Sequence, residues 1–347
     1  MRRSLSALSV ILPVILAVMP WSAALSIGLA FSVAAQPAEK FAFALNWFPV
    51  GDHAAYWVAL EKGYFSARGL DVALENSKGS GDSLAKVDTG RADAGLADTA
   101  VVVAGLARTA RVKIVGMIFD KTPLNVFSRA DNPIRRPKDL EGKTIAAPPG
   151  DSQRQIWPAF VKANQIDDSK VVWVNVEPAA KIAALAEKRV DAAADYTTGL
   201  PYYEKPLGVG NVVMLPWADF GLDMYSMSII AGEKTMAERG KALGAFLEAA
   251  YLGWRDVMAD PAAAVAIFKK RVPEIDVNIT EANLKLGLEL MRTPSYEANG
   301  IGSIEPQKMC TSVDLVNTYM GLPRKVDCAS VFTDQFLTRV PMPAAPR

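Results

Sequence analysis

Two stretches of the chain repeat one pattern: residues 84–99 read LAKVDTGRADAGLADT, and residues 182–197 read IAALAEKRVDAAADYT. Identical or similar residues recur at seven positions, all at an offset of 98 residues. Each copy has the pattern of an amphipathic helix, a turn with Arg and Asp, a short apolar strand and a polar residue at the strand end. Chance is the alternative, because Ala and Leu are common here, but the single offset favours a structural repeat. The repeat therefore predicts two similar α/β lobes.

Strand and helix patterns also alternate on both sides of the first copy. Residues 41–45, 70–74 and 112–119 have the pattern of buried strands, and residues 54–62 that of a helix that ends at Gly63. Strands separated by helices are typical of a parallel sheet with helices on both faces. We therefore expect each lobe to be a mostly parallel sheet flanked by helices.

Two extended crossover strands are expected to join the lobes. The first leads into a short helix, a Gly and a new strand at residues 139–145, and the return is expected between residues 212 and 230. A mature chain of about 310 residues is more than one compact core usually covers. We therefore predict a discontinuous first lobe (38–127 and 223–347), which includes the C-terminal helices, and a second lobe at 128–222.

The first 35 residues have the pattern of a secretory signal peptide. Arg2 and Arg3 precede an uncharged stretch that ends in Val33-Ala34-Ala35, with small residues where a signal peptidase cleaves. A membrane anchor is the alternative, because the apolar run is long enough to span a bilayer, but prolines and serines interrupt it. We expect cleavage near Ala35 and a periplasmic mature protein. No Cys follows the apolar run, which argues against a lipid anchor.

Charge and cysteine content exclude several classes of protein. Without Arg2 and Arg3, 36 basic residues stand against 37 acidic ones, so the charge offers no case for binding nucleic acid or an anionic membrane. Cys310 and Cys328 are the only cysteines, and in an oxidising periplasm they are a candidate disulfide. A metal pair fits less well, because no His lies nearby.

The single histidine, His53, also argues against catalysis. No HxxH or HExxH spacing is possible with one His, and the chain has no G-x-S-x-G nucleophile motif to partner it. We therefore predict no metal site, no cofactor and no Ser-His-Asp chemistry. His53 itself is either a hydrogen-bond partner of a ligand or a satisfied structural residue.

Polar residues after the predicted strands are the candidate ligand contacts, because ligands of open α/β sheets bind beyond the carboxyl ends of the strands. Trp47 can stack on a flat ligand and Asn46 can donate and accept hydrogen bonds; the alternative is that Trp47 caps the core. A single Asp is more often a cap or a solvated turn residue than a ligand contact, so the set matters more than its members. The full set is Asn46, Trp47, Asp52, His53, Tyr56, Ser80, Asp98, Thr99, Asp120, Ser152, Arg154, Asp195, Tyr196 and Trp217.

This candidate set is acidic and aromatic. Arg154 and Lys121 are the only basic residues expected near the cleft. Such a site suits a planar ligand with ring or amino N–H donors, or a cationic amine, and suits sulfate-like anions poorly. The sequence therefore favours a heteroaromatic nitrogen compound as the ligand.

Four segments resemble a known family. Leu45-Asn46-Trp47-Phe48-Pro49 and the run Tyr56–Phe65 are similar to the opening of periplasmic binding proteins for sulfonates, nitrate and thiamine pyrimidine precursors. Asp139–Ile145 resembles the entry to their second lobe, and Asp260–Val265 resembles their C-terminal helical signature. The resemblance covers nearly the whole mature chain and is specific for the superfamily rather than for the ligand.

The resemblance implies a two-lobed, type II-like periplasmic binding protein whose lobes close on a small molecule. Its partners would be the membrane permease and the ATPase of an ABC importer, and we expect a monomer that is not an enzyme. Sulfonates, nitrate or aromatic acids are alternative ligands. The family also contains pyrimidine synthases that consume a histidine and pyridoxal and carry a Cys-rich iron site, which two C-terminal cysteines do not match. A sensor domain that serves a membrane kinase as a separate soluble partner is a third possible role.

Overall fold

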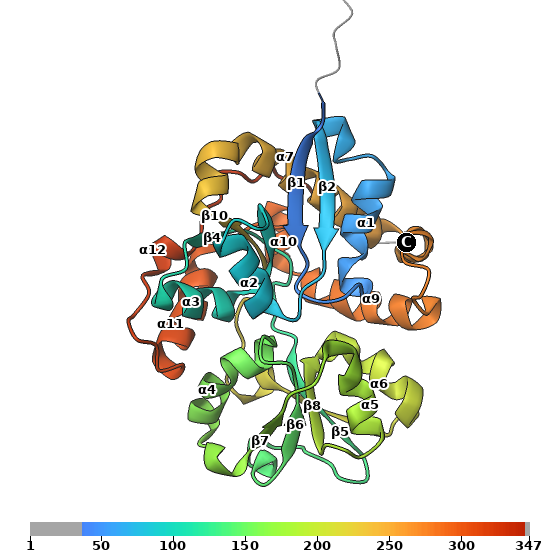
Figure 1. Cartoon of the computed structure of the whole chain (residues 1–347), viewed down its shortest axis with the longest axis vertical. Helices are drawn as coiled ribbons and strands as arrows, with labels where there is room; N and C mark the ends of the chain where they lie inside the picture. Colours follow the sequence, from blue (N-terminus) through green and yellow to red (C-terminus); the bar gives the residue numbers. More distant parts are fainter. Residues whose placement is uncertain (1–36, 344–347) are drawn as a thin grey trace, which may run out of the picture. The chain divides into compact units, whose positions relative to one another are not determined.

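The computed structural model describes residues 37–343, which form one compact unit. The predicted signal peptide and its cleavage site lie outside the described residues. The unit contains two five-stranded sheets, and we call the part of the chain around each sheet a lobe (Figure 1). Within the described residues, no helix is both long and apolar enough to cross a membrane.

The first lobe is built on the strand order β2-β1-β3-β10-β4. Strands β1, β2 and β3 are parallel, whereas β10 is antiparallel to both β3 and β4. Aromatic residues pack one face of this sheet: Phe41 and Phe43 lie 4.7 and 4.6 Å from the ring of Phe246. The strands are β1 (Glu39–Ala44), β2 (Leu70–Glu75), β3 (Ala94–Asp98), β4 (Val112–Met117) and β10 (Met227–Gly232).

The second lobe repeats this topology in the order β7-β6-β8-β5-β9. Here β6, β7 and β8 are parallel, and β5 is antiparallel to β8 and β9. In each sheet, the strand that follows a crossover from the other lobe (β10 in the first, β5 in the second) therefore takes the fourth position and is antiparallel to both neighbours. The strands are β5 (Leu124–Arg129), β6 (Thr144–Ala146), β7 (Val172–Val174), β8 (Ala192–Tyr196) and β9 (Val212–Pro216).

The helices cover both faces of each sheet, and those after β10 pack around the first lobe (Figure 1). The helix start signals are visible locally: Asp260 and Asp276 accept hydrogen bonds from backbone amides of the helices they precede, at 3.0 and 3.2 Å. The helices are α1 (Ala54–Glu61), α2 (Ser80–Asp88), α3 (Thr99–Arg108), α4 (Ser152–Asn164), α5 (Lys181–Ala186), α6 (Leu200–Leu207), α7 (Glu233–Ala259), α8 (Pro261–Arg271), α9 (Val277–Met291), α10 (Pro294–Asn299), α11 (Pro306–Tyr319) and α12 (Cys328–Val331).

The 98-residue repeat is a structural one. Its copies form α2–β3 and α5–β8, and β3 and β8 occupy the third place in their sheets. The aspartates of the two turns make equivalent hydrogen bonds. Asp93 accepts one from the Ala42 amide of β1 at 2.8 Å, and Asp191 accepts one from the Thr144 amide of β6 at 2.9 Å. Each ties its turn to the neighbouring parallel strand, which explains why Asp recurs there.

Two connections run between the sheets, at residues 118–123 and 221–226. The expected border at residues 127 and 128 falls inside β5, which belongs wholly to the second sheet. All six residues of β5 are buried, polar Asn125, Ser128 and Arg129 included, so the alternation that marks a half-exposed strand is absent and a connecting segment looks the same as a central strand. The division of the chain into two domains stays a prediction.

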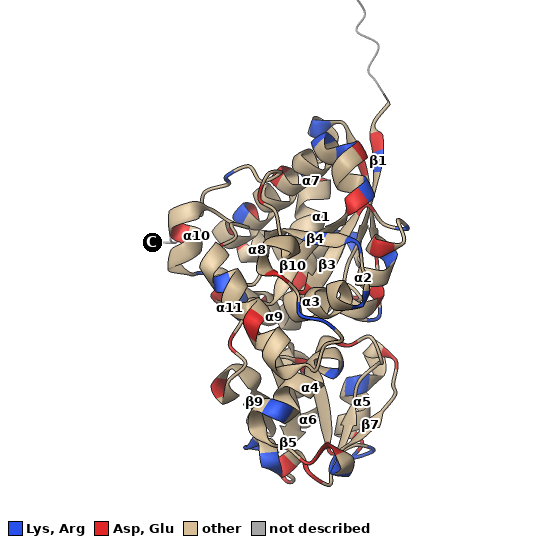
Figure 2. Ribbon diagram, turned by 90° about the vertical axis from the view of Figure 1, so that its left-hand side faces the viewer, with Lys and Arg blue, Asp and Glu red and all other residues tan. Residues whose placement is uncertain are grey.

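A disulfide bond joins two helices of the C-terminal segment. Cys310 of α11 and Cys328 of α12 form a disulfide bond. Lysine, arginine and acidic residues are interspersed over both lobes (Figure 2).

Candidate functional site

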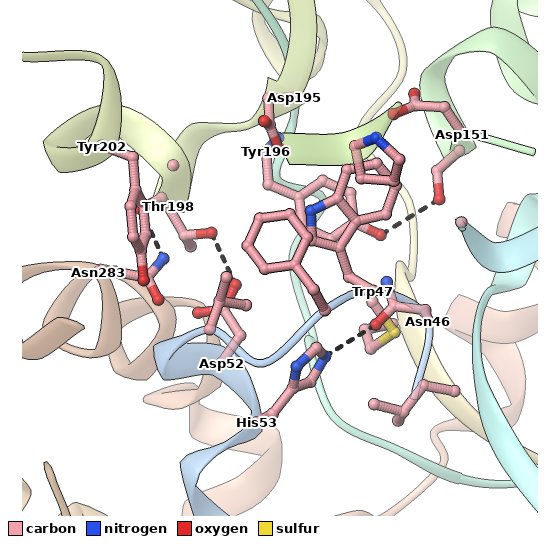
Figure 3. A pocket seen from close by; sticks show the side chains of 18 of the residues that line it. Asn46, Trp47, Asp52, His53, Asp151, Asp195, Tyr196, Thr198, Tyr202 and Asn283 are labelled. Atoms are coloured by element: carbon pink, nitrogen blue, oxygen red, sulfur yellow. Dashed lines mark hydrogen bonds between the residues drawn. The ribbon is translucent and has the colours of Figure 1, made fainter. Parts of the chain in front are cut away.

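A cavity lies between the carboxyl ends of the two sheets' parallel strands. It contains about 810 Å³ of space free of protein atoms, part of it open to solvent. The first lobe contributes the loop after β1 with the short helix η1 (Gly51–His53), the second lobe the starts of α4 and α5 and the segment after β8. Figure 3 shows these side chains converging from both lobes.

The loop after β1 reaches the cavity because glycine lets it approach α9. A Cβ atom on Gly51 would lie 2.4 Å from Asn283 Oδ1 and 2.7 Å from the Thr280 carbonyl oxygen. Any side chain at this position would push η1 away from α9. The close approach brings Asp52 and His53 to the cavity wall beside Asn283.

Lys181 is the centre of a buried charged cluster on the second-lobe side. Its Nζ lies 3.1 Å from both Asp151 and Asp195 and donates to the Ala194 carbonyl at 2.7 Å. Burial acts to lower the pKa of Lys181, but the two carboxylates outweigh it and raise the pKa. Trp47 of the first lobe covers the ammonium group, with Nζ 4.4 Å from the ring centre.

Asp52 lies at the other end of the cavity (Figure 3). Its Oδ2 accepts a hydrogen bond from the Thr198 hydroxyl at 2.8 Å. Burial raises the pKa of Asp52 to about 7, although the hydrogen bond from Thr198 opposes this shift.

His53 and Asn46 form a neutral pair in the wall. His53 Nε2 lies 3.0 Å from Asn46 Oδ1, and because a carbonyl oxygen only accepts, Nε2 carries the proton. Burial lowers the pKa of His53 to about 4. The ring is thus uncharged at neutral pH and adds no positive charge to the cavity.

The lobes also touch directly behind the cavity. The Tyr196 hydroxyl of the second lobe donates to Asp98 of the first, and Ser80 and Ser152 are 2.8 Å apart through their hydroxyls. The Gly81 amide donates to the Gly150 carbonyl at 3.1 Å. We call this set of contacts the seam; it shows the cleft in a closed arrangement.

Seven of the fourteen candidate residues from the sequence line the cavity, and the other seven do not. Those in the lining are Asn46, Trp47, Asp52, His53, Ser152, Asp195 and Tyr196. Of the others, Ser80 and Asp98 belong to the seam, and Thr99 donates to the Ser226 carbonyl at 2.9 Å. Ser80 and Asp98 lie at a helix start and a strand end as expected, but they face the opposite lobe rather than the cavity, and Thr99 binds the connection at residues 221–226.

The remaining four candidates contribute to the structure away from the cavity: Tyr56, Asp120, Arg154 and Trp217. Asp120 is buried and pairs with Lys308 at 2.7 Å. Tyr56 packs in the core 4.8 Å from the ring of Phe43.

Trp217 does not form an aromatic wall of the cavity. It is fully buried and stacks on Phe160 with the ring centres 4.4 Å apart. Arg154 also lies away from the cavity. Its guanidinium carbon lies 5.5 Å from the ring centre of Trp173, and the group donates a hydrogen bond to Asn175. Lys121 is exposed and is not part of the lining.

Several lining residues were not predicted. Lys181, Tyr202 and Asn283 gave no signal, because each lies in a helix rather than at a strand end, whereas Thr198 follows β8 by two residues and did have one. Asp151 also had a signal in the sequence, because an Asp directly before a helix is typical of an N-cap residue. Its side chain accepts a hydrogen bond from the Gln153 amide at 3.0 Å.

Residues 50–264 match the model of the family described as NMT1/THI5 like. The chain belongs to the NMT1/THI5-like family. It is similar to the riboflavin-binding protein RibY of Chloroflexus aurantiacus, with 25% identity over 316 residues that cover 87% of this chain and 88% of RibY. It is also similar to the formylaminopyrimidine-binding protein of Halalkalibacterium halodurans, with 26% identity over 74% of this chain and 79% of that protein.

The fold of this NMT1/THI5-like protein is that of the periplasmic binding proteins. The alkanesulfonate-binding protein SsuA from Xanthomonas axonopodis, solved with MOPS bound, superposes with a TM-score of 0.67 and 17% identity over 88% of this chain and all of that one. The predicted two-lobed architecture is confirmed, and so is the resemblance stated from the sequence.

Proposed function

We propose that this protein is the periplasmic solute-binding component of an ABC importer and that it captures a small, flat, heteroaromatic nitrogen compound, such as a thiamine pyrimidine precursor. The ligand enters the open cleft and bridges the two lobes, which shifts the population toward the closed form. The closed form then docks on a membrane permease served by an ATPase. The role is binding, without bond chemistry, by a monomer.

The charge balance of the cavity carries the choice of ligand. Among the described lining residues, the one Lys or Arg side chain is Lys181, and two carboxylates already hold it. His53 is neutral and adds no positive charge. A free anion would therefore meet no available cation, whereas a ligand with N–H donors would meet acceptors.

The aromatic lining supports a flat ligand. Trp47, Phe48, Phe119, Tyr196 and Tyr202 all face the cavity. Aromatic rings bury a planar heterocycle on its faces and leave its edge for hydrogen bonds. The names of two relatives agree with this, since riboflavin and formylaminopyrimidine are both flat nitrogen heterocycles.

A sulfonate, nitrate or aromatic acid is the alternative ligand within the same importer class. Its support is the fold shared with SsuA, but that likeness concerns the backbone only. An anion would require Lys181 to leave one of its carboxylates, and the buried carboxylate left behind would then be unpaired, which costs several kcal/mol.

Two measurements test the proposal. The protein is purified without refolding, denatured, and the released small molecules are identified by mass spectrometry. In parallel, thermal shift is recorded with riboflavin, a formylaminopyrimidine, an alkanesulfonate and nitrate. We expect stabilisation by at least one nitrogen heterocycle and by neither anion; stabilisation by the sulfonate or nitrate alone would overturn the proposal.

A further inference from the structure

Three side chains from two lobes meet at the Tyr202 end of the cavity (Figure 3). Thr198 comes from the second lobe, directly after β8, whereas Asp52 of η1 and Asn283 of α9 come from the first. Thr198 is bound on both sides: its hydroxyl donates to Asp52 Oδ2 at 2.8 Å, and its carbonyl accepts from Asn283 Nδ2 at 2.7 Å. These two hydrogen bonds join the lobes.

Two buried oxygen atoms in this cluster have no hydrogen-bond partner. They are Asp52 Oδ1 and Asn283 Oδ1. Asp52 is partly exposed as a residue, but this oxygen has almost no contact with solvent. Both atoms are acceptors when Asp52 is ionised, so neither can satisfy the other, and an unpaired buried acceptor is costly.

A single proton on Asp52 Oδ1 would give both unpaired oxygen atoms a hydrogen-bond partner. We propose that protonated Asp52 donates from Oδ1 to Asn283 Oδ1 and so completes a ring with Thr198, the proton latch, which holds the cleft closed. The neutral acid still accepts the Thr198 hydroxyl on Oδ2. In the open form Thr198 moves away with the second lobe, Asp52 is hydrated, and it ionises at its ordinary pKa. Closing therefore takes up one proton.

Other titratable groups near Asp52 do not produce the same pH dependence. Asp195 adds to the upward shift of the Asp52 pKa, but it is paired with Lys181 at 3.1 Å. The pKa of Tyr202 is raised to about 12 by burial, and that of His53 is lowered to about 4, so neither titrates between pH 6 and 8.

Several charged side chains on the helices around η1 have partners of opposite charge, and Glu289 of α9 is exposed to solvent. On α9, Lys285 pairs with Glu281 at 2.7 Å. On α6, Lys205 pairs with Asp276 at 2.9 Å. On α1, Glu61 is held by Lys270 and Arg271 of α8.

The sign of the effect follows from the pKa difference. Burial in the closed form raises the pKa of Asp52 from an ordinary value of 3.8 to about 7. Between these values the closed form binds more protons than the open form, so closing weakens as pH rises. The equilibrium constant for closing should fall about tenfold from pH 6 to pH 8 and change little above pH 8.

The latch rests on one part of the proposed function, the opening and closing of the two lobes. It does not depend on the identity of the ligand, so its test needs no ligand. Cysteines replace exposed Asp71 of the first lobe and Val209 of the second, and carry a dye pair while the native disulfide stays bonded. Single-molecule energy transfer then gives the closed fraction of the ligand-free protein at pH 6, 7 and 8. Failure of the ligand proposal would leave this measurement unaffected.

Asp52→Asn is the decisive variant, because its carboxamide mimics the protonated acid: the oxygen accepts from Thr198 and the amide donates to Asn283. We expect this variant to close at pH 8 at least as well as the wild type does at pH 6, with no dependence on pH. A pH-independent closing constant in the wild type, or a slope that survives in Asp52→Asn, would overturn the latch. The wild-type titration alone decides the matter if the variant does not fold.

Discussion

Replacing Lys181 by Met should destabilise the protein at neutral pH far more than removing a surface charge does. The ammonium group lies 3.1 Å from Asp151 and Asp195 and is fully buried. Met fills a similar volume but leaves Asp151, which is 3% exposed, without its cation. Breaking a buried ion pair in this way costs about 3–5 kcal/mol, a large part of the roughly 5–15 kcal/mol that stabilises a typical protein.

Urea unfolding followed by circular dichroism measures the loss. Lys188→Met is the matched control in the same lobe, because its pair with Asp131 is exposed on both sides (64% and 53%) and should contribute about 0–1 kcal/mol. A loss below about 1 kcal/mol for Lys181→Met, or one equal to the control, would refute the view that the cluster holds a buried charge.

The same variant should be less impaired at pH 5 than at pH 7. Burial already raises the pKa of Asp151, and Lys181 opposes this shift; without Lys181 the pKa rises further. Because the unfolded chain ionises at the ordinary pKa, the folded variant binds more protons between the two values, and its stability falls as pH rises. Asp151→Asn, which keeps the helix cap, should recover part of the loss in the double variant.

Three further outcomes follow from the site and its supports. Trp47→Ala should weaken ligand binding by about 1–3 kcal/mol by calorimetry if the ring stacks on the ligand, with the fold unchanged by circular dichroism. Gly150→Ala should lower the closed fraction, because a Cβ atom there would lie 3.0 Å from the Lys78 carbonyl across the seam, whereas Gly81→Ala, with 3.4 Å to its nearest neighbour, should not. Removing the Cys310–Cys328 bond, which closes a loop of 18 residues, should cost about 3 kcal/mol in a melting experiment, and an unchanged melting temperature would show that α11 and α12 hold without it.

The fold was predictable because its signals are local and repeated. Strand β1 was expected at residues 41–45 and is found at Glu39–Ala44, with helices where apolar residues recur at helical spacing. β5 was less visible, because all its residues are buried and a short extended run has the same pattern in a crossover and in a sheet centre. Its place was fixed by pairing with β8 and β9, which are more than 60 residues away in the chain.

The site was only half predictable, because strand ends in a two-lobed protein face two different surroundings. Asp52 and Asp98 both follow predicted strands, yet Asp52 lines the cavity and Asp98 binds Tyr196 in the seam. Sequence patterns place a residue at a strand end but do not say whether the opposite lobe or open space faces it. Asn283 illustrates the larger difficulty, since it reaches the cavity from a helix after the second crossover.

The repeat does explain how the charged cluster arose within a shared backbone. At the offset of 98 residues, Lys181 corresponds to Ser83 and Asp195 to Ala97. In the first lobe these two positions are buried and uncharged, with Ser83 donating to the Ala44 carbonyl. In the second lobe both positions are charged, and they pair with each other at 3.1 Å. Asp195 without Lys181 would lose its cation, whereas Lys181 without Asp195 would still have Asp151 at 3.1 Å, so the cluster depends mainly on the lysine. The two copies share their backbone, and ligand selectivity should therefore depend on the positions where they differ, as this pair does beside Trp47.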